Sequence, residues 1–162
     1  GTGSCCIILS ILSELKNTKG IGIDISLKAI NIAKQKQRRH GLRNITKFCL
    51  KSIENFSGRN FDVIVSNPPY IKRKDIKNLD EDIKKFEPKI ALDGGNDGLD
   101  VIKKVIYKSK SILKIRGLLA LEIGNGQFKK VSNILRKNKF KTKYLVKDYR
   151  DNIRCILSTL EK

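Results

Sequence analysis

The sequence is poor in residue types that would each point to a particular class of protein. It has no Met or Trp, one His, four Cys and three Pro among 162 residues. No apolar run approaches the roughly 20 residues of a membrane-spanning helix, so we predict a soluble protein. The cysteines form no Cys-x-x-Cys pair, and the sequence offers one histidine as a further metal ligand. Free thiols in a reducing compartment are therefore expected, with no disulfide and no metal site.

Acidic residues are also scarce, with 16 Asp and Glu against 35 Lys and Arg and a formal charge of +19. A basic surface binds nucleic acid by releasing counterions from phosphates. The basic residues are spread over nearly the whole chain, however, and Lys, Ile and Asn are all abundant, as in AT-rich coding sequence. Compositional drift and a selected basic surface near ribosomal RNA both remain open, because charge informs association more than chemistry.

One motif points to a particular chemistry. The apolar run 61–65 predicts a buried strand, and Asn67, Pro68, Pro69 and Tyr70 follow it almost at once. The two prolines fix φ and donate no hydrogen bond, so they hold the neighbouring acceptors in one arrangement. In open α/β sheets, ligands bind outside the carboxyl ends of strands. This motif in that place is the signature of methyltransferases that act on planar nitrogen.

The remaining pattern indicates an α/β fold. Helices are expected over residues 6–15 (mostly buried), 26–41 (capped by Ser26), 98–114 and 127–138. Strands are expected over residues 20–25, 44–50, 61–66, 117–123, 140–147 and 154–160. Residues 71–97 predict a long loop or lid with short helical pieces. The last two strands are too close for a helical crossover and predict an antiparallel hairpin at the edge of a doubly wound, mostly parallel sheet.

The first residues predict a cofactor site. The turn of Gly1, Thr2 and Gly3 precedes a helix, and Asp24 ends the next strand about 20 residues later. That spacing suits a nicotinamide dinucleotide as well as S-adenosylmethionine. The Asp24 carboxylate would accept hydrogen bonds from both ribose hydroxyls; alternatively, it pairs with a backbone N–H in the turn before Ser26. The Asn-Pro-Pro-Tyr motif favours the methyl donor.

The motif also suggests how a weak nucleophile is handled. The lone pair of an amide or exocyclic nitrogen is delocalised into the adjacent π-system. If the Asn67 side-chain oxygen and the Pro68 carbonyl each accept one N–H of that NH₂ group, the nitrogen is oriented for in-line attack. Tyr70 would supply a flat wall for the planar group. The alternative is an ordinary Asn-Pro turn with a core tyrosine.

These motifs together resemble the peptide chain release factor N5-glutamine methyltransferases, the HemK/PrmC family. The matching blocks are Gly1 to Ser4, Gly22 to Ser26, residues 61–71, Glu87-Pro88, Ala91-Leu92, Asp97 to Leu99, Leu121 to Gly124 with Gln127, and Lys147-Asp148 with Arg154. The resemblance implies the class I S-adenosylmethionine-dependent methyltransferase fold over residues 1–162. It also implies that the family's first strand is missing from this chain, so the domain is expected to be partial at its N-terminus.

The resemblance further implies a reaction and its participants. The donor would be S-adenosylmethionine, held by Gly1, Thr2, Gly3, Asp24, Ser52 and Asn67. The substrate would be the glutamine of the Gly-Gly-Gln motif in release factors, bound by Asn67, Pro68, Pro69 and Tyr70, with Asn67 and Pro68 catalytic and the enzyme cytoplasmic. Cys5 stands where the family has a third glycine, and we expect its side chain to crowd the cofactor. A ribosomal-protein glutamine, a nucleic-acid exocyclic amine, and an inactive fragment with residual basic RNA or ribosome binding are the alternatives.

Overall fold

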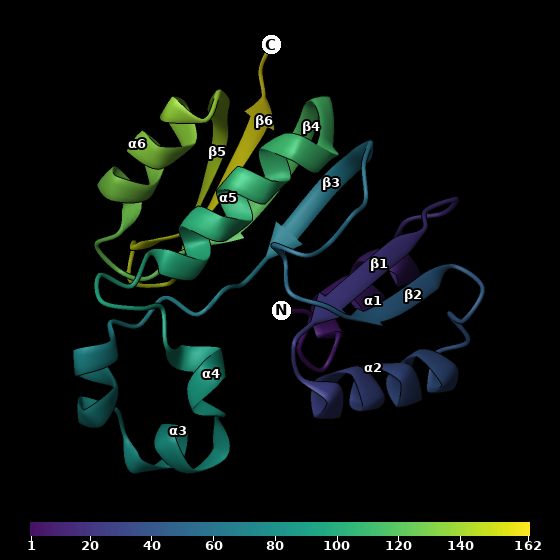
Figure 1. Cartoon of the computed structure of the whole chain (residues 1–162), viewed down its shortest axis with the longest axis horizontal. Helices are drawn as coiled ribbons and strands as arrows, with labels where there is room; N and C mark the ends of the chain where they lie inside the picture. The colour runs from purple at the N-terminus through teal and green to yellow at the C-terminus, as the bar shows by residue number, and fades with distance from the viewer. The chain divides into compact units, whose positions relative to one another are not determined.

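The computed structural model describes all residues from 1 to 162, and its helices and strands follow the predicted order (Figure 1). The chain divides into two compact units, Gly1–Phe56 and Ser57–Lys162, and each is described by itself. A single catalytic domain over residues 1–162 stays a prediction. None of the helices combines the length and the apolar character that crossing a membrane requires.

The first unit pairs two parallel strands with two helices. Its elements are α1 (Cys6–Glu14), β1 (Gly20–Asp24), α2 (Leu27–Arg39) and β2 (Thr46–Leu50). In the register of the two strands, Asp24 lies opposite Leu50, so both strands end at the same edge. The Ser26 hydroxyl accepts a hydrogen bond from the Ala29 N–H at 3.2 Å, which confirms the predicted cap of α2.

The core of this unit corrects two predictions about its first residues. Cys5, Leu9, Ile30, Ala33 and Phe48 form one buried cluster. The Cys5 side chain is fully buried in this cluster, and its thiol donates to the Ala33 carbonyl at 3.6 Å. We had expected the Cys5 side chain to crowd the cofactor. Instead, it packs into the core of this unit. The prediction of a mostly buried α1 is also wrong, because α1 buries only Leu9 and Leu12.

The second unit contains a four-stranded mixed sheet. Its strands are β3 (Phe61–Ser66), β4 (Leu113–Glu122), β5 (Phe140–Lys147) and β6 (Ile153–Leu160), in the order β3-β4-β6-β5. β3 and β4 are parallel, whereas β6 is antiparallel to both β4 and β5, which confirms the C-terminal hairpin. The ends of β3 and β4 therefore share one edge of the sheet with the start of β6 and the β5–β6 turn.

Helices cover one face of this sheet. α5 (Asp100–Ile112) packs against β3 and β4, and α6 (Phe128–Lys137) packs against β5 (Figure 1). The segment between β3 and α5 holds three short helices, η1 (Arg73–Asn78), α3 (Glu81–Phe86) and α4 (Lys89–Leu92), as the prediction of helical pieces in a long loop anticipated. Fully buried side chains from α5, β4 and β6, among them Ile102, Leu119 and Ile156, form the centre of the core.

The sheets differ from the prediction in pairing and burial. The strands form two separate sheets, with β1 paired only to β2 and β3 paired only to β4, so parallel and antiparallel pairings are equally frequent. The run 61–65 was predicted to be a buried strand, but Val63 is 50% exposed and Val65 is 40% exposed. Val63 and Val65 are two positions apart, so both side chains point to the same face of β3, whereas the half-buried Ile64 between them points to the other face.

Candidate functional site

Asp24 organises the first predicted cluster, within Gly1–Phe56. One carboxylate oxygen accepts the Gly3 N–H and the other accepts the Ser26 N–H, both at 2.8 Å. The Thr2 N–H donates to the Ile23 carbonyl at 2.7 Å, which places the glycine turn beside the end of β1. The structure thus brings Gly1, Thr2, Gly3 and Asp24 together. Asp24 makes the backbone pairing that was the alternative to ribose binding, but each carboxylate oxygen has a second lone pair.

A hollow opens next to this cluster at the shared end of β1 and β2. It encloses about 400 Å³ and is lined by Ile25, Leu50, Lys51, Ser52 and Asn55. Two exposed apolar side chains, Ile25 and Leu50, face it together with the polar Ser52 and Asn55. Apolar walls with a few polar groups suit a flat heterocycle. Ser52 lines this hollow, and its predicted contact with the cofactor stays a prediction.

The second predicted cluster lies within Ser57–Lys162, immediately after β3. Asn67 is exposed and its side chain takes part in none of the hydrogen bonds of the chain, so its amide is available to a ligand. Pro68 is buried, and Pro69 and Tyr70 are half-buried. The structure thus places the motif as a turn at the carboxyl end of a parallel strand. The predicted contact of Asn67 with the cofactor stays a prediction.

Two charged side chains hold the ring of Tyr70 in place. Arg154, at the start of β6, donates to the Tyr70 hydroxyl at 2.9 Å, and its guanidinium carbon lies 5.4 Å from the ring centre. The Tyr70 hydroxyl in turn donates to Glu122, at the end of β4, at 3.5 Å. Tyr70 is therefore a fixed surface of the turn and not a core tyrosine, because its contacts are with charged groups at the sheet edge.

A glycine loop packs on the same turn. A Cβ atom on Gly94 would lie 2.8 Å from the Tyr70 Cα and 2.9 Å from the Pro69 carbonyl oxygen, so only glycine permits this approach. The Gly94 N–H donates to the Ile71 carbonyl at 2.8 Å, and the Ile71 N–H donates to the Leu92 carbonyl at 3.1 Å. The loop at Gly94 thus packs directly against the backbone of the motif and forms hydrogen bonds with the residue that follows it.

A basic hollow adjoins this loop. It encloses about 500 Å³, and its lining comprises Arg73, Lys89, Ile90, Asp93, Gly95, Asp100, Val101 and Lys104. Arg73 donates to Asp93 at 2.9 Å, and this hydrogen bond, with one from the Gly95 N–H, holds the pKa of Asp93 below its usual range. Asp93 therefore stays ionised and partly neutralises the hollow.

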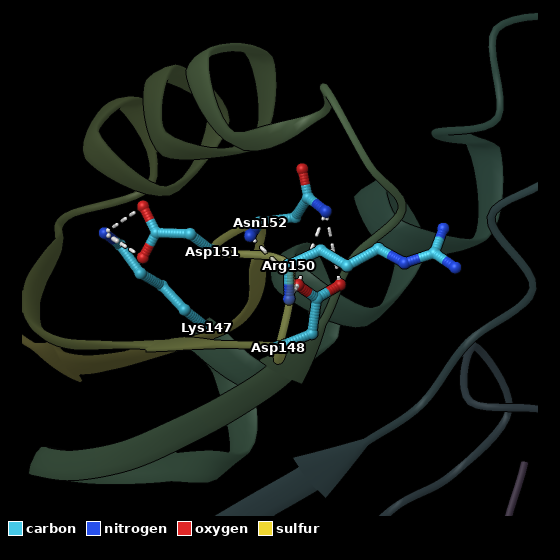
Figure 2. Close-up of polar contacts among 5 residues, drawn as sticks. All are labelled: Lys147, Asp148, Arg150, Asp151 and Asn152. Carbon is cyan, nitrogen blue, oxygen red and sulfur yellow. Dashed lines mark hydrogen bonds and ion pairs between the residues drawn. The ribbon is translucent and has the colours of Figure 1, made fainter.

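The β5–β6 turn lies at the same edge of the sheet as the motif (Figure 1). One Asp148 oxygen accepts the backbone N–H groups of Arg150 and Asn152 at 2.9 and 3.0 Å, while Lys147 pairs with Asp151 (Figure 2). The Arg150 guanidinium extends away from these contacts (Figure 2). Tyr149 beside it is fully exposed, so a rigid turn presents both side chains to solvent.

Sequence reasoning assigned no role to Glu122, Gln127 or Arg154. The signal that would have found them is topological. Glu122 ends a strand parallel to β3, and Gln127 follows it in the loop before α6. Arg154 is the second residue of β6, which is antiparallel to β4. Each of these positions falls at the edge where the motif emerges, so predicting the strand order would have predicted their meeting.

Comparison with known proteins adds a family. The family model described as "Methyltransferase domain" matches residues 1–156. The chain is 37% identical over 158 residues to "Release factor glutamine methyltransferase" of Rhodospirillum rubrum, covering 98% of this chain and 49% of that protein. It is 40% identical over 162 residues to the protein of the same name from Clostridium acetobutylicum, covering 97% of this chain and 56% of that protein. The chain thus spans about half the length of these relatives.

A solved structure shows the same fold. The ribosomal protein L11 methylase from Lactobacillus delbrueckii subsp. bulgaricus superposes with a TM-score of 0.72 at 18% identity, over 100% of this chain and 68% of that one. The predicted fold of the class I S-adenosylmethionine-dependent methyltransferases is thereby confirmed. The chain belongs to the methyltransferase domain family.

Proposed function

We propose that this chain transfers a methyl group from S-adenosylmethionine to the side-chain amide nitrogen of the glutamine in the Gly-Gly-Gln motif of peptide chain release factors. The observation that carries the proposal is the turn after β3, where the Asn67 amide is free and Tyr70 is fixed. The name of the relatives, release factor glutamine methyltransferase, supports the choice of substrate.

The residues of Gly1–Phe56 fit the cofactor. Gly1, Thr2, Gly3 and Asp24 would hold its amino acid and ribose portions, and Ser52 would contact its adenine in the hollow lined by Ile25 and Leu50. When bound, S-adenosylmethionine supplies an electrophilic methyl group on a sulfonium. The hollow suits the adenine of the cofactor, because its apolar walls would bury the faces of a purine and its polar residues would contact the ring edge.

The chain's own residues would activate the amide by positioning. The Asn67 side-chain oxygen and the Pro68 carbonyl would each accept one N–H of the glutamine side chain, and Tyr70 would cover its planar face. Holding both protons turns the lone pair toward the methyl donor and stabilises the positive charge that develops on nitrogen. No general base is required before attack, because the N–H proton becomes acidic only after the new bond forms.

The substrate and the setting follow from the same proposal. The partner would be a release factor whose Gly-Gly-Gln loop reaches the sheet edge, and translation termination takes place in the cytoplasm. The net charge of +19 would add weak association with the ribosome or its RNA. That charge also favours one second candidate, methylation of an exocyclic amine in nucleic acid, whose planar NH₂ group the same turn would bind. A ribosomal-protein glutamine would suit the turn equally well.

A methyl-transfer assay separates these substrates. Purified protein would be incubated with S-adenosylmethionine that carries a labelled methyl group, and with a release factor, a ribosomal protein or RNA in turn. Label in the release factor, lost when its Gly-Gly-Gln glutamine is replaced, is the expected result. Asn67→Ala should abolish transfer, because the substrate amide loses one of its two hydrogen-bond acceptors. Label only in RNA or ribosomal protein, or full turnover by Asn67→Ala, would overturn the proposal.

A further inference from the structure

The Gln127 side chain joins three segments around the Asn-Pro-Pro-Tyr turn. Its Nε2 donates to the Tyr70 carbonyl at 3.0 Å and to the Gly98 carbonyl at 3.1 Å, and its Oε1 accepts the Gly124 N–H at 2.8 Å. Tyr70 follows β3, Gly98 precedes α5 and Gly124 follows β4. One amide group thus links loops that are up to 57 residues apart in the sequence.

Only a primary amide of this length meets all three partners. Both N–H donors are used and the oxygen accepts, so the amide satisfies two carbonyls and one N–H. Gly98 makes room for it, since its φ of +75° favours glycine and a Cβ atom there would lie 2.8 Å from the Gln127 Nε2. A carboxylate at this position would offer acceptors to two carbonyl oxygens, which is repulsive.

The Gln127 contact reaches the substrate turn through few free torsions. The Tyr70 carbonyl and the Ile71 N–H belong to the same peptide group, and the latter donates to the Leu92 carbonyl at 3.1 Å. That peptide group is therefore held on both sides. Pro68 and Pro69 have fixed φ angles, so an orientation imposed at Tyr70 extends back to the Pro68 carbonyl and Asn67.

We infer that Gln127 is a positioning residue for methyl transfer, which fixes the Tyr70 peptide group and thereby aims the Asn67 and Pro68 oxygens at the substrate amide. This inference rests on the proposed function for the identity of the substrate, but not for the geometry. It assigns Gln127 a role separate from that of Arg154, which holds the ring of Tyr70 and not its backbone.

Gln127→Glu tests the role with an almost isosteric change, and Gln35→Glu on the exposed face of α2 is the matched control. A displacement of about 1 Å costs up to about 10²-fold in rate. We therefore expect kcat to fall by about that factor in Gln127→Glu, with the KM for S-adenosylmethionine within about twofold of wild type. Lowering the pH should narrow the deficit, because the introduced carboxyl group regains one donor when it is protonated.

Gln127→Met removes both donors without adding charge, and its deficit in kcat should not change with pH. If Gln127→Glu does not fold, as judged by circular dichroism, Gln127→Met gives the comparison of kcat alone. A kcat within twofold of wild type in the folded variants would overturn the inference, as would an equal loss in the Gln35→Glu control.

Amide hydrogen exchange at Ile71 provides a second readout that needs no substrate. Exchange there should be at least about tenfold faster in Gln127→Glu and Gln127→Met than in Gln35→Glu, because the peptide group is no longer held at the Tyr70 carbonyl. Unchanged exchange would overturn the inference. If the wild-type chain methylates no release factor, the proposed function fails, and the exchange rates still decide whether Gln127 fixes the turn.

Discussion

The Arg154 guanidinium donates a hydrogen bond to the Tyr70 hydroxyl at 2.9 Å, and its central carbon lies 5.4 Å from the centre of the same ring. These two residues are 84 positions apart in the sequence and meet because β6 begins where β3 ends. The Glu122 Oε1 atom lies 3.8 Å from the Arg154 Nη2 atom, and this ion pair keeps the guanidinium directed at this edge of the sheet. The ring of Tyr70 is therefore fixed by groups outside its own turn.

Replacing Arg154 by Met should loosen the ring of Tyr70. The variant loses a charge-assisted hydrogen bond and a cation–π contact, so we expect the free energy of unfolding to fall by about 2 kcal/mol. Methyl transfer should fall by at least about tenfold, because Tyr70 no longer presents a fixed wall. Urea denaturation and the transfer assay measure the two effects.

Tyr70→Phe, which removes only the hydroxyl, completes a double-mutant cycle with Arg154→Met. Since both single variants break the same hydrogen bond, the double variant should be less destabilised than the sum of the two, by about 1 kcal/mol. Strict additivity would show that the contact contributes nothing to stability.

Asp24→Ala should destabilise the first unit and weaken cofactor binding together. The Gly3 and Ser26 N–H groups lose their shared acceptor, which we expect to cost about 3 kcal/mol in the free energy of unfolding. Calorimetry should show an affinity for S-adenosylmethionine at least about tenfold weaker. Ser26→Ala is the control: it removes the helix cap, at about 1 kcal/mol, and leaves the Asp24 contacts in place. Undiminished cofactor affinity in Asp24→Ala would contradict the assignment.

Local signals predicted most of the elements. The range of β5 agrees with the predicted strand 140–147, and α2 ends at Arg39 before Gly41, as its capping residues indicated. β4 begins at Leu113, whereas the prediction placed its start at residue 117. The prediction missed these residues because Lys114 and Arg116 alternate with apolar residues, and the register with β3 shifts there. A polar residue at every second position hides a strand from a search for apolar runs.

Tertiary contacts determined what the sequence did not predict. The exposure of Val63 depends on which elements cover the face of β3 to which it points, and apolar composition carries no such information. The burial of Cys5 follows from its φ of +64°, which turns the side chain toward Ala33. Gln127 meets Tyr70 only because the loops after β3 and β4 lie at the same edge. Motifs therefore point to candidate residues, whereas the strand order determines which of these residues meet.

The adjacent thiols of Cys5 and Cys6 should differ sharply in reactivity. A hydrogen bond with the Ser4 hydroxyl and the positive charge of Lys36 lower the pKa of the exposed Cys6 thiol, whereas burial raises the pKa of Cys5. Because the thiolate is the nucleophile, alkylation of Cys6 should reach half its maximal rate at a lower pH than alkylation of an ordinary cysteine. Cys5 should react only on unfolding.

Fragment-ion mass spectrometry after timed iodoacetamide treatment resolves the two cysteines. Ser4→Ala should move the pH midpoint of Cys6 alkylation upward, and Lys36→Gln should do the same, because each removes a group that favours the thiolate. Equal labelling rates of Cys5 and Cys6 in the folded protein would show that the Cys5 side chain is not in the core.

The order of the β5–β6 turn should depend on the ionisation of Asp148. Hydrogen bonds from backbone N–H groups, that of Asn152 first and that of Arg150 with it, lower the pKa of this carboxyl group (Figure 2). A lowered pKa means that the stabilisation is present above the unfolded-state pKa of aspartate and is lost as the pH falls through the lower folded-state value. NMR shifts of the Arg150 and Asn152 amides should therefore change together only in the acid range.

Asp148→Ala should remove this dependence at every pH. Both backbone amides lose their acceptor, so we expect the free energy of unfolding to fall. Asp151→Asn is the matched control, because it removes only an exposed ion pair with Lys147 and keeps a residue that tolerates a φ of +62°. Its cost should stay below about 0.5 kcal/mol. A larger loss in Asp151→Asn than in Asp148→Ala would mean that the ion pair, and not the Asp148 carboxylate, orders the turn that carries Tyr149 and Arg150.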